Sequence, residues 1–493
     1  MGPETEEPSD ASEESSLPAR PIRDEGGLRL GITVVTLFFV ASFIDITESG
    51  PASILLFGLL AGAGSFTAFL RPRWFPAILV AYFPFSMQYP FALGAGVNMV
   101  NVLMLLGVVA LVSHREQSRI RYRFTAFELL LLLFLALGFA GFVRTYLTVR
   151  DFGDALTQFK RWATPPIFFF LLRALLAERR DIARLIKVMA WTTVMAAVLT
   201  WWDAIEKGPR SSIEASRVSG IFNGPNEMGT FLVYSSMMML AVVVWRTSAG
   251  KRMLYLGGFL LAARAMLFTF SRGAYVSLAI GSALILLLRN PFYLVGAGTL
   301  GAAAVALNPG LLPDSVVTRL AQTTRETAGG GDLEEANLDK SVSHRFVLWR
   351  AARLMIEDHP LAGVGLGRFA YHLDGYVERP LKEHEAKDVH NAYLLVATEL
   401  GIPALLVMIA ILVSFFVTCL KLYFGRRHGF DRMVALGAVG SVVALACTLM
   451  LGSRFADENY IGYFWTLAAF IMVLRHFRDL PRGTQWIEKG RAG

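Results

Sequence analysis

The amino-acid sequence predicts an all-α, polytopic membrane helical bundle of about 14 spans, with one large extracytoplasmic loop between late spans. Composition is the first observation behind this prediction: 54% of the 493 residues are hydrophobic and 17% are charged, whereas soluble domains carry roughly 25% charged residues. The second observation is the length of the apolar runs, which matches the roughly 17–25 residues that cross a ~30 Å hydrocarbon layer. The third is the loop itself, 308–401, which is the one long polar insertion among apolar segments.

The predicted spans share this length and are separated by polar segments. They are 29–46, 51–70, 74–92, 96–113, 126–143, 162–178, 183–203, 227–245, 253–270, 273–289, 291–307, 402–420, 433–452 and 459–475. The segment 74–92 carries internal prolines, so a kinked or re-entrant helix is an alternative there.

Basic residues are concentrated in alternate loops, which sets the expected orientation. The loops of the basic set contain Arg71, Arg73, Arg115, Arg119, Arg121, Arg123, Arg179, Arg180, Arg184, Lys187, Arg246, Lys251, Arg252, Lys421, Arg426, Arg427 and Arg432. The positive-inside rule places this set and both termini in the cytoplasm. This distribution also accounts for the net charge of +8 without a nucleic-acid partner.

The same reasoning gives the domain organisation. Residues 1–28 form an acidic tail expected to be disordered and cytoplasmic, 29–307 an N-terminal transmembrane bundle, 308–401 a large periplasmic loop with amphipathic helices, 402–476 the C-terminal transmembrane helices, and 477–493 a basic cytoplasmic tail. Cys419 and Cys447 lie in apolar runs, which excludes a disulfide framework and a cysteine metal site.

Several cations lie on the side that the rule disfavours, and an anionic ligand at the outer face would give them a reason to be there. They are Arg144, Arg150, Lys160, Arg161, Arg217, Arg272, Arg345 and Arg454. Arg272 joins two apolar runs of a tight helical hairpin, so either it is a snorkelling helix anchor or it binds phosphate between the small residues Ser271 and Gly273. Lys160 and Arg161 are weaker candidates of the same kind.

The segment RVSGIFNGPNEMGTF, 217–231, contains a helix-start signal at Pro225-Asn226. Asn226 is explained either by helix capping or by a role beside Arg217, where a positive helix end and a guanidinium favour a polyanion.

The large loop contains five of the eight histidines. HRFVLWRAARLMIEDH, 344–359, has the apolar spacing of an amphipathic helix on the membrane surface, and Arg345 faces either solvent and lipid headgroups or a ligand. The glycine-rich GVGLGRF, 363–369, follows no strand, so it does not indicate a nucleotide loop.

His390 lies at the aqueous end of a short apolar segment, interfacial or re-entrant. It is either a residue of the interfacial belt or a general base, because imidazole titrates near neutral pH. A metal set of His384, Glu385, Asp388 and His390 is a further alternative, although its spacing matches no helical His-x-x-x-His site.

Four motifs taken together carry a resemblance to a known family. SRGA after an apolar run, NGPN opening a span, HRFVLW followed by HPLAGVGLGRF, and HNAYLLVATELGI resemble the O-antigen ligase and O-antigen polymerase superfamily of bacterial inner-membrane proteins. The likeness covers roughly 140–475 and departs from the family in the long acidic tail and the large number of spans.

The resemblance implies a GT-C-like membrane glycosyltransferase of polysaccharide or lipopolysaccharide biosynthesis. Its donor would be an undecaprenyl-diphosphate-linked oligosaccharide and its acceptor a glycan or lipid, with membrane lipids and envelope polysaccharide export or assembly proteins as partners. No nucleotide sugar, cofactor or catalytic metal is implied. Arginines matching Arg272 and Arg345 would hold the diphosphate, and a histidine matching His390 would deprotonate the acceptor hydroxyl.

Physical chemistry agrees with these roles, because cations stabilise a leaving pyrophosphate and a base on the opposite side of the anomeric carbon gives inversion. Arg217 would join the two arginines. A membrane transporter of a small anion or solute is the alternative, but little charge lies at the midplane of the spans and no inverted repeat is evident. A structural scaffold would leave the outward arginines unexplained.

Overall fold

The structure is a computed structural model that describes residues 25–43, 51–89, 91, 98–113, 124–208, 216–245, 247–308, 340–377, 389–425, 428–452, 455 and 458–479. Within these ranges all regular structure is helical, as predicted. The helices are α1 (Gly26–Phe43), α2 (Pro51–Leu70), η1 (Pro72–Trp74), α3 (Phe75–Tyr82), η2 (Phe83–Phe85), α4 (Met99–Ser113), α5 (Ala126–Val149), α6 (Phe152–Leu175), α7 (Arg179–Lys207), α9 (Pro225–Val244), α10 (Ala249–Leu267), α11 (Arg272–Arg289), α12 (Pro291–Leu307), α14 (Lys340–Asp358), α15 (Phe369–His372), η4 (Leu373–Gly375), α16 (Ala392–Leu400), α17 (Ile402–Gly425), α18 (Gly429–Leu449) and α19 (Glu458–Asp479).

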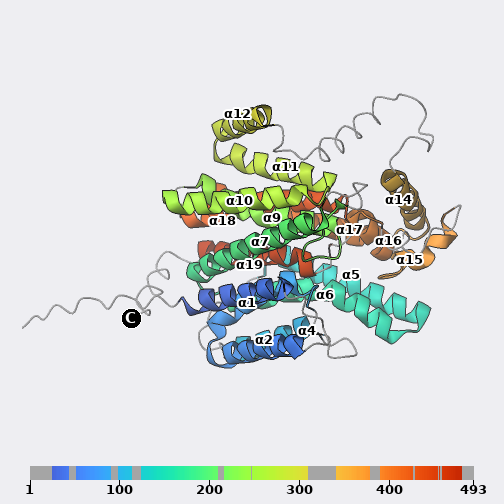
Figure 1. Ribbon diagram of the computed structural model, residues 1–493. Coiled ribbons are helices and arrows are strands. Elements are labelled where there is room, and N and C mark those ends of the chain that lie inside the picture. Colours follow the sequence, from blue (N-terminus) through green and yellow to red (C-terminus); the bar gives the residue numbers. More distant parts are fainter. Residues whose placement is uncertain are drawn as a thin grey trace, which may run out of the picture.

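The long helices run side by side in stacked layers, with α2 and α4 at one edge, α11 and α12 at the other, and α14, α15 and α16 grouped at one end (Figure 1). Helix α9 lies at the centre and packs against α7, α10, α11, α18 and α19. Its residues from Phe231 to Val242 are buried all round, which is the pattern of a helix in the middle of a bundle.

By length and composition, six described segments are long and apolar enough to cross a membrane: α5, α7, α9, α11, the continuous segment α16–α17 and α18. Parts of α1, α2, α4, α12 and α19 are shorter apolar helices. These helices support a multi-pass membrane protein. Fewer than the predicted number of about 14 spans meet the criterion. The described apolar stretches of α1, α2, α4, α12 and α19 are too short, the segment 74–92 is divided, and α6 and α10 are interrupted by charged residues.

The predicted span 74–92 is not a single membrane-crossing helix. It is divided into the eight-residue α3 and the short η2, with a turn after Phe85. Pro84 explains the break, because proline removes a backbone donor and ends regular α-helical hydrogen bonding. Every residue from Phe75 to Phe85 is buried, so the segment is a core element under α1 and α7.

Several central helices have ends that meet at one end of the bundle, and the loops at these ends are ones that the sequence placed together on the extracytoplasmic side. The C-terminal ends of α7, α10 and α18 and the N-terminal ends of α9, α11 and α16 lie together at the end of the bundle that carries α14 and α15 (Figure 1). We call this the cavity end.

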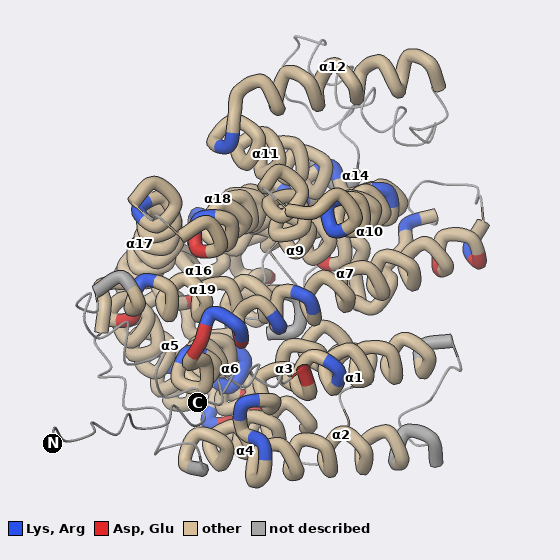
Figure 2. Tube along the Cα trace, turned by 90° about the vertical axis from the view of Figure 1, so that its left-hand side faces the viewer, with Lys and Arg blue, Asp and Glu red and all other residues tan. Residues whose placement is uncertain are grey.

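The opposite end of the bundle, which we call the remote end, carries several described basic residues of the set that the sequence assigned to the cytoplasm. In Figure 2, which faces that side, lysines and arginines lie on the starts of α10 and α18 and on the end of α11. Here Arg179 donates to both oxygens of Asp431, at 2.7 and 3.0 Å, and Arg184 pairs with Asp181. Arg289 and Arg432 lie on the ring of Trp245.

The described part of the large loop has a small core of its own. Helix α14 buries Leu348, Ala351, Ala352 and Met355 against residues that include Val364 and Phe369. The helix expected over 344–359 is therefore present, but this apolar face packs on protein, and only part of it, such as Phe346 at 51% exposed, faces outward. Helical periodicity alone cannot distinguish packing on a membrane surface from packing on protein, because both require the same apolar stripe.

The glycine-rich segment of the loop allows two chain segments to cross closely. Gly363, Gly365 and Gly367 all have positive φ, a backbone conformation that residues with a side chain rarely adopt. A Cβ on Gly363 would lie 2.3 Å from the backbone of Glu399 in α16, and Val364 and Gly365 donate to the carbonyl oxygens of Thr398 and Glu399. The motif is therefore a backbone crossing that fixes the loop to α16.

Candidate functional site

A cavity of ≈ 210 Å³ opens at the cavity end of the bundle. Its walls come from four separate parts of the chain, and they contain three of the predicted arginines. The lining residues are Arg217, Asn226, Phe270, Ser271, Arg272, Gly273, Arg345, Phe346, Trp349 and Leu451. Residues more than one hundred positions apart in the sequence thus meet in one place.

Arg272 enters the cavity from the first position of α11. Helix α10 ends in a tight turn over Phe268–Phe270, and Ser271 is the N-cap of α11, which gives the predicted helical hairpin. A Cβ on Gly273 would lie 2.6 Å from the end of the Leu451 side chain, so a larger residue there would displace this lining side chain.

Arg217 is oriented by two hydrogen bonds. Its Nη2 donates to Asn226 Oδ1 at 2.6 Å and its Nε donates to the carbonyl oxygen of Thr269 at 3.0 Å. Asn226 is the second residue of α9, whose N-cap is Gly224. The capping alternative for Asn226 is therefore incorrect: its side-chain oxygen holds the guanidinium of Arg217.

The end of α7 fixes the backbone that carries Arg217. Lys207 Nζ donates to the carbonyl oxygen of Arg217 at 3.2 Å, and Asp203 Oδ2 accepts from the backbone N–H groups of Ser219 and Gly220 at 3.2 and 3.3 Å. Gly220 has φ +54°, and a Cβ there would lie 2.5 Å from Thr200. This arrangement makes the 217–224 segment a rigid support rather than a loose loop.

Arg345 comes from the opposite wall, on α14, together with Phe346 and Trp349. The buried face of α14 in the loop core holds this helix in place. The side chains of Arg345, Phe346 and Trp349 extend from positions adjacent to that face, which brings a cation and two aromatic rings to the cavity.

His390 lies beside the cavity wall rather than among the lining residues. Trp349, which lines the cavity, donates through Nε1 to the carbonyl oxygen of Val389 at 3.0 Å. Ala392 donates to the carbonyl oxygen of Gly452 at 2.9 Å, next to the lining residue Leu451. The residues on both sides of His390 are thus bonded to the wall, so His390 and Arg272 occupy the same end of the bundle.

The start of α16 explains the position of His390. Asn391 is the N-cap and its Oδ1 accepts from the N–H groups of Tyr393 and Leu394 at 3.0 and 3.1 Å, an arrangement that satisfies helix-terminal donors. His390 precedes this cap with φ +54°. Only Phe91, Arg150, Phe270 and His390 have positive φ among the described non-glycine residues, and two of these four border the cavity. Such backbone strain is concentrated at functional sites.

The cavity is electropositive. It is lined by the guanidinium groups of Arg217, Arg272 and Arg345, and none of the described residues that line it is acidic. Two hydrogen bonds from Arg217 go to the neutral oxygens of Asn226 and Thr269. Planar guanidinium groups bind phosphate oxygens through paired N–H donors, so the cavity has the chemistry of an anion site.

The other predicted site residues do not line this cavity. Lys160 and Arg161 lie on α6, outside the set of lining residues. His384, Glu385, Asp388 and Arg454 lie outside the described residues. In the ranges that the structure describes, no group of three His, Cys, Asp or Glu side chains is suited to a metal ion.

Sequence reasoning did not assign Phe270, Phe346, Trp349 or Leu451 to the site. Trp349 follows Arg345 by four residues and Phe346 by three residues on the same helix, and this helical spacing was the one available signal for them. Leu451 lies at the end of a span and its sequence context contains no such signal, because its role depends on the approach of α11.

Residues 257–409 match the family model described as O-antigen ligase. The match extends from α10 to the start of α17 and confirms the resemblance to the O-antigen ligase and polymerase superfamily. Arg272, Arg345 and His390 fall inside the matched region, whereas Arg217 and Asn226 lie before it. A search of curated proteins gives no match. At a coarse level, the match of this region supports a glycosyltransferase-like membrane enzyme of the kind that handles lipid-linked glycans.

Proposed function

We propose that the protein transfers undecaprenyl-diphosphate-linked glycan to an acceptor hydroxyl at the periplasmic face of the inner membrane, as a ligase or a polymerase. The observation that carries the proposal is the meeting of Arg217, Arg272 and Arg345 in one cavity beside His390. The family match favours this chemistry for an anion site.

The arginines would bind the diphosphate of the donor. The cavity, at ≈ 210 Å³, is smaller than the roughly 300–1,000 Å³ of pockets for drug-sized ligands. It suits a diphosphate, while the glycan and the isoprenoid would extend outside it. Negative charge develops on the leaving diphosphate in the transition state, and pre-oriented cations stabilise it there.

His390 would act as the general base. The acceptor oxygen forms a bond to the anomeric carbon and its proton passes to the imidazole, while the bond between the anomeric carbon and the phosphate oxygen breaks and undecaprenyl diphosphate leaves. Attack from the side opposite the leaving group inverts the anomeric configuration. The guanidinium groups provide the charge compensation in this scheme, so it requires no metal ion.

The direct test is transfer by the purified protein in proteoliposomes, supplied with lipid-linked donor and acceptor. His390→Ala should lower the rate by about 10²–10⁴-fold, the range that a general base contributes. His359→Ala, a histidine of the same loop that does not border the cavity, should retain activity. Equal rates for both variants would contradict the role of His390.

A deletion strain separates ligase from polymerase. Gel analysis of the surface glycan should show a single repeat on the lipid A core if the protein is a polymerase, and uncapped core if it is a ligase. An unchanged glycan ladder would contradict both.

A further inference from the structure

The tip of the α5–α6 hairpin, residues 139–159, extends past the ends of the central helices at the cavity end (Figure 1). The sequence placed most of this segment in a loop, 144–161, but both helices continue through it to a turn at Arg150 and Asp151. At 1.5 Å per residue, a 24-residue helix is about 36 Å long. This exceeds a hydrocarbon layer of ~30 Å, so about one helical turn reaches the headgroup region.

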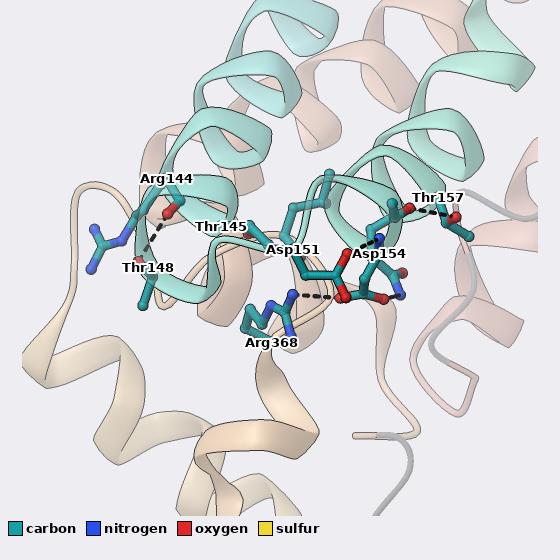
Figure 3. A network of polar contacts seen from close by, with 10 residues as sticks. Arg144, Thr145, Thr148, Asp151, Asp154, Thr157 and Arg368 are labelled. Atoms are coloured by element: carbon teal, nitrogen blue, oxygen red, sulfur yellow. Dashed lines mark hydrogen bonds and ion pairs between the residues drawn. The ribbon is translucent and has the colours of Figure 1, made fainter.

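One side of the tip holds the large loop. Thr145 donates to the carbonyl oxygen of Leu366 at 3.1 Å, and Arg368 forms an ion pair with Asp154. In Figure 3 these contacts lie together, while the side chain of Arg144 points away from Arg368. Gly141 is in contact distance of Leu400, so the same side also meets α16.

The opposite side of the tip is a continuous aromatic surface, which we call the ring face: Phe139, Phe142, Tyr146, Phe152 and Phe159. Their rings contact one another with centroid separations of 5.4–6.1 Å. Phe139, Tyr146 and Phe152 are 53%, 41% and 56% exposed. A water-facing surface of this kind would be unfavourable, because each Å² of apolar surface left in water forgoes about 25 cal/mol.

The ring face continues the exposed stripe of a candidate membrane span. Leu129, Leu132 and Leu133 are exposed lower on α5, and Phe139, Val143 and Leu147 follow at helical spacing. The stripe of Leu129, Leu132 and Leu133 faces lipid in any membrane-spanning arrangement of α5. Because the ring face continues this stripe toward the cavity end, it would lie in the headgroup region of the leaflet on that side. Aromatic residues are enriched at that depth.

Continuity with a candidate membrane span favours lipid over a second copy of the chain. The exposed stripe of α5 runs directly into the ring face, so the two form one surface. Arg150 lies at the turn of the same hairpin, where phosphate groups of a leaflet would attract it.

We propose that the ring face docks on the phospholipid headgroup region of the cavity-end leaflet, and that the hairpin thereby fixes the height of the loop that carries Arg345 and His390. Lipid holds one side of the tip and the Arg368–Asp154 and Thr145–Leu366 contacts hold the loop on the other. The inference concerns position in the membrane and does not depend on the proposed reaction.

Depth measurement by spin labelling tests this. Cys419 and Cys447 are replaced by alanine, and single cysteines are introduced by Phe152→Cys, Leu133→Cys as a lipid-facing reference, and Tyr371→Cys as a matched control. Tyr371 is on the loop and 67% exposed. In proteoliposomes, collision with oxygen is compared with collision with a water-soluble nickel chelate.

The ratio of the collision rate with oxygen to that with the nickel chelate should be several-fold higher for the label at 152 than for the label at 371. It should be lower than the ratio for the label at 133. A ratio at 152 equal to that at 371 would overturn the proposal, because the ring face would then face water. Dipolar broadening between labels at 152, removed by dilution with unlabelled protein, would also overturn it and identify a contact between two copies.

Discussion

At the remote end of the bundle, Arg179 donates to both oxygens of the buried Asp431, whereas at the cavity end Arg217 donates to an amide oxygen and a backbone carbonyl oxygen. The guanidinium group of Arg179 is paired with a buried carboxylate, and that of Arg217 is oriented by two neutral oxygens. The first arrangement stabilises helix packing. The second orients a guanidinium group at the wall of the cavity, as an anion site requires.

The largest effect is expected at Arg272. Arg272→Ala should lower the transfer rate by about 10²–10³-fold, because one charge-stabilising donor contributes that much in comparable sites. The melting temperature in detergent should stay close to that of the parent protein. Arg272→Lys keeps the charge but loses the planar fork, so its rate should fall between the two. A fully active Arg272→Ala variant would remove the contrast between the two ends.

At the remote end the consequence should be reversed. Arg179→Ala leaves the carboxylate of Asp431 buried without this partner, and breaking such a pair costs about 3–5 kcal/mol. We expect a lower melting temperature and near-normal activity for each folded molecule. Arg353→Ala is the control, because the Arg353–Glu357 pair is exposed and such pairs contribute about 0–1 kcal/mol.

A smaller effect at Asn226 sharpens the distinction between orientation and neutralisation. Asn226→Ala removes one hydrogen bond from Arg217 and should raise the apparent KM for donor by about 10-fold, or 1.4 kcal/mol. Asn226→Asp should retain the hydrogen bond and add a negative charge beside the guanidinium. If the cavity binds an anion, Asn226→Asp is the more damaging of the two in a transfer assay. The reverse order would indicate a purely structural role.

The smallest effect is a pH dependence of the loop. Burial lowers the pKa of His372 from its ordinary value of 6.5, and His359, Arg144 and Arg368 lower it further. The neutral form therefore stabilises the folded loop at pH above about 6.5, and this contribution is lost as the pH falls through the lowered pKa. Melting temperatures at pH 7.5 and 5.5 should differ less in His372→Gln than in the parent protein. An equal difference in both would assign the pH dependence elsewhere.

Hydropathy predicts much of the fold because a lipid-facing helix needs only an apolar run of sufficient length. Thus α10 and α11 lie close to their predicted ranges, with Arg272 at their junction. It does not predict which protein surface an apolar face meets. For this reason the packing of α14 against Val364 and Phe369 and the backbone crossing at Gly363 were not predicted. The contact between Arg217 and Asn226 depends on how the ends of several helices come together. The sequence indicates only that the loops that carry these residues lie on the same side of the membrane.

Trp349 belongs to two structures at once. Its side chain is part of the cavity wall, and its indole N–H holds the carbonyl oxygen of Val389, the residue before His390. Trp349 therefore connects the arginine-lined wall to the backbone beside His390. Because of this shared contact, substitutions at 349 and 390 should be non-additive in a double-mutant cycle.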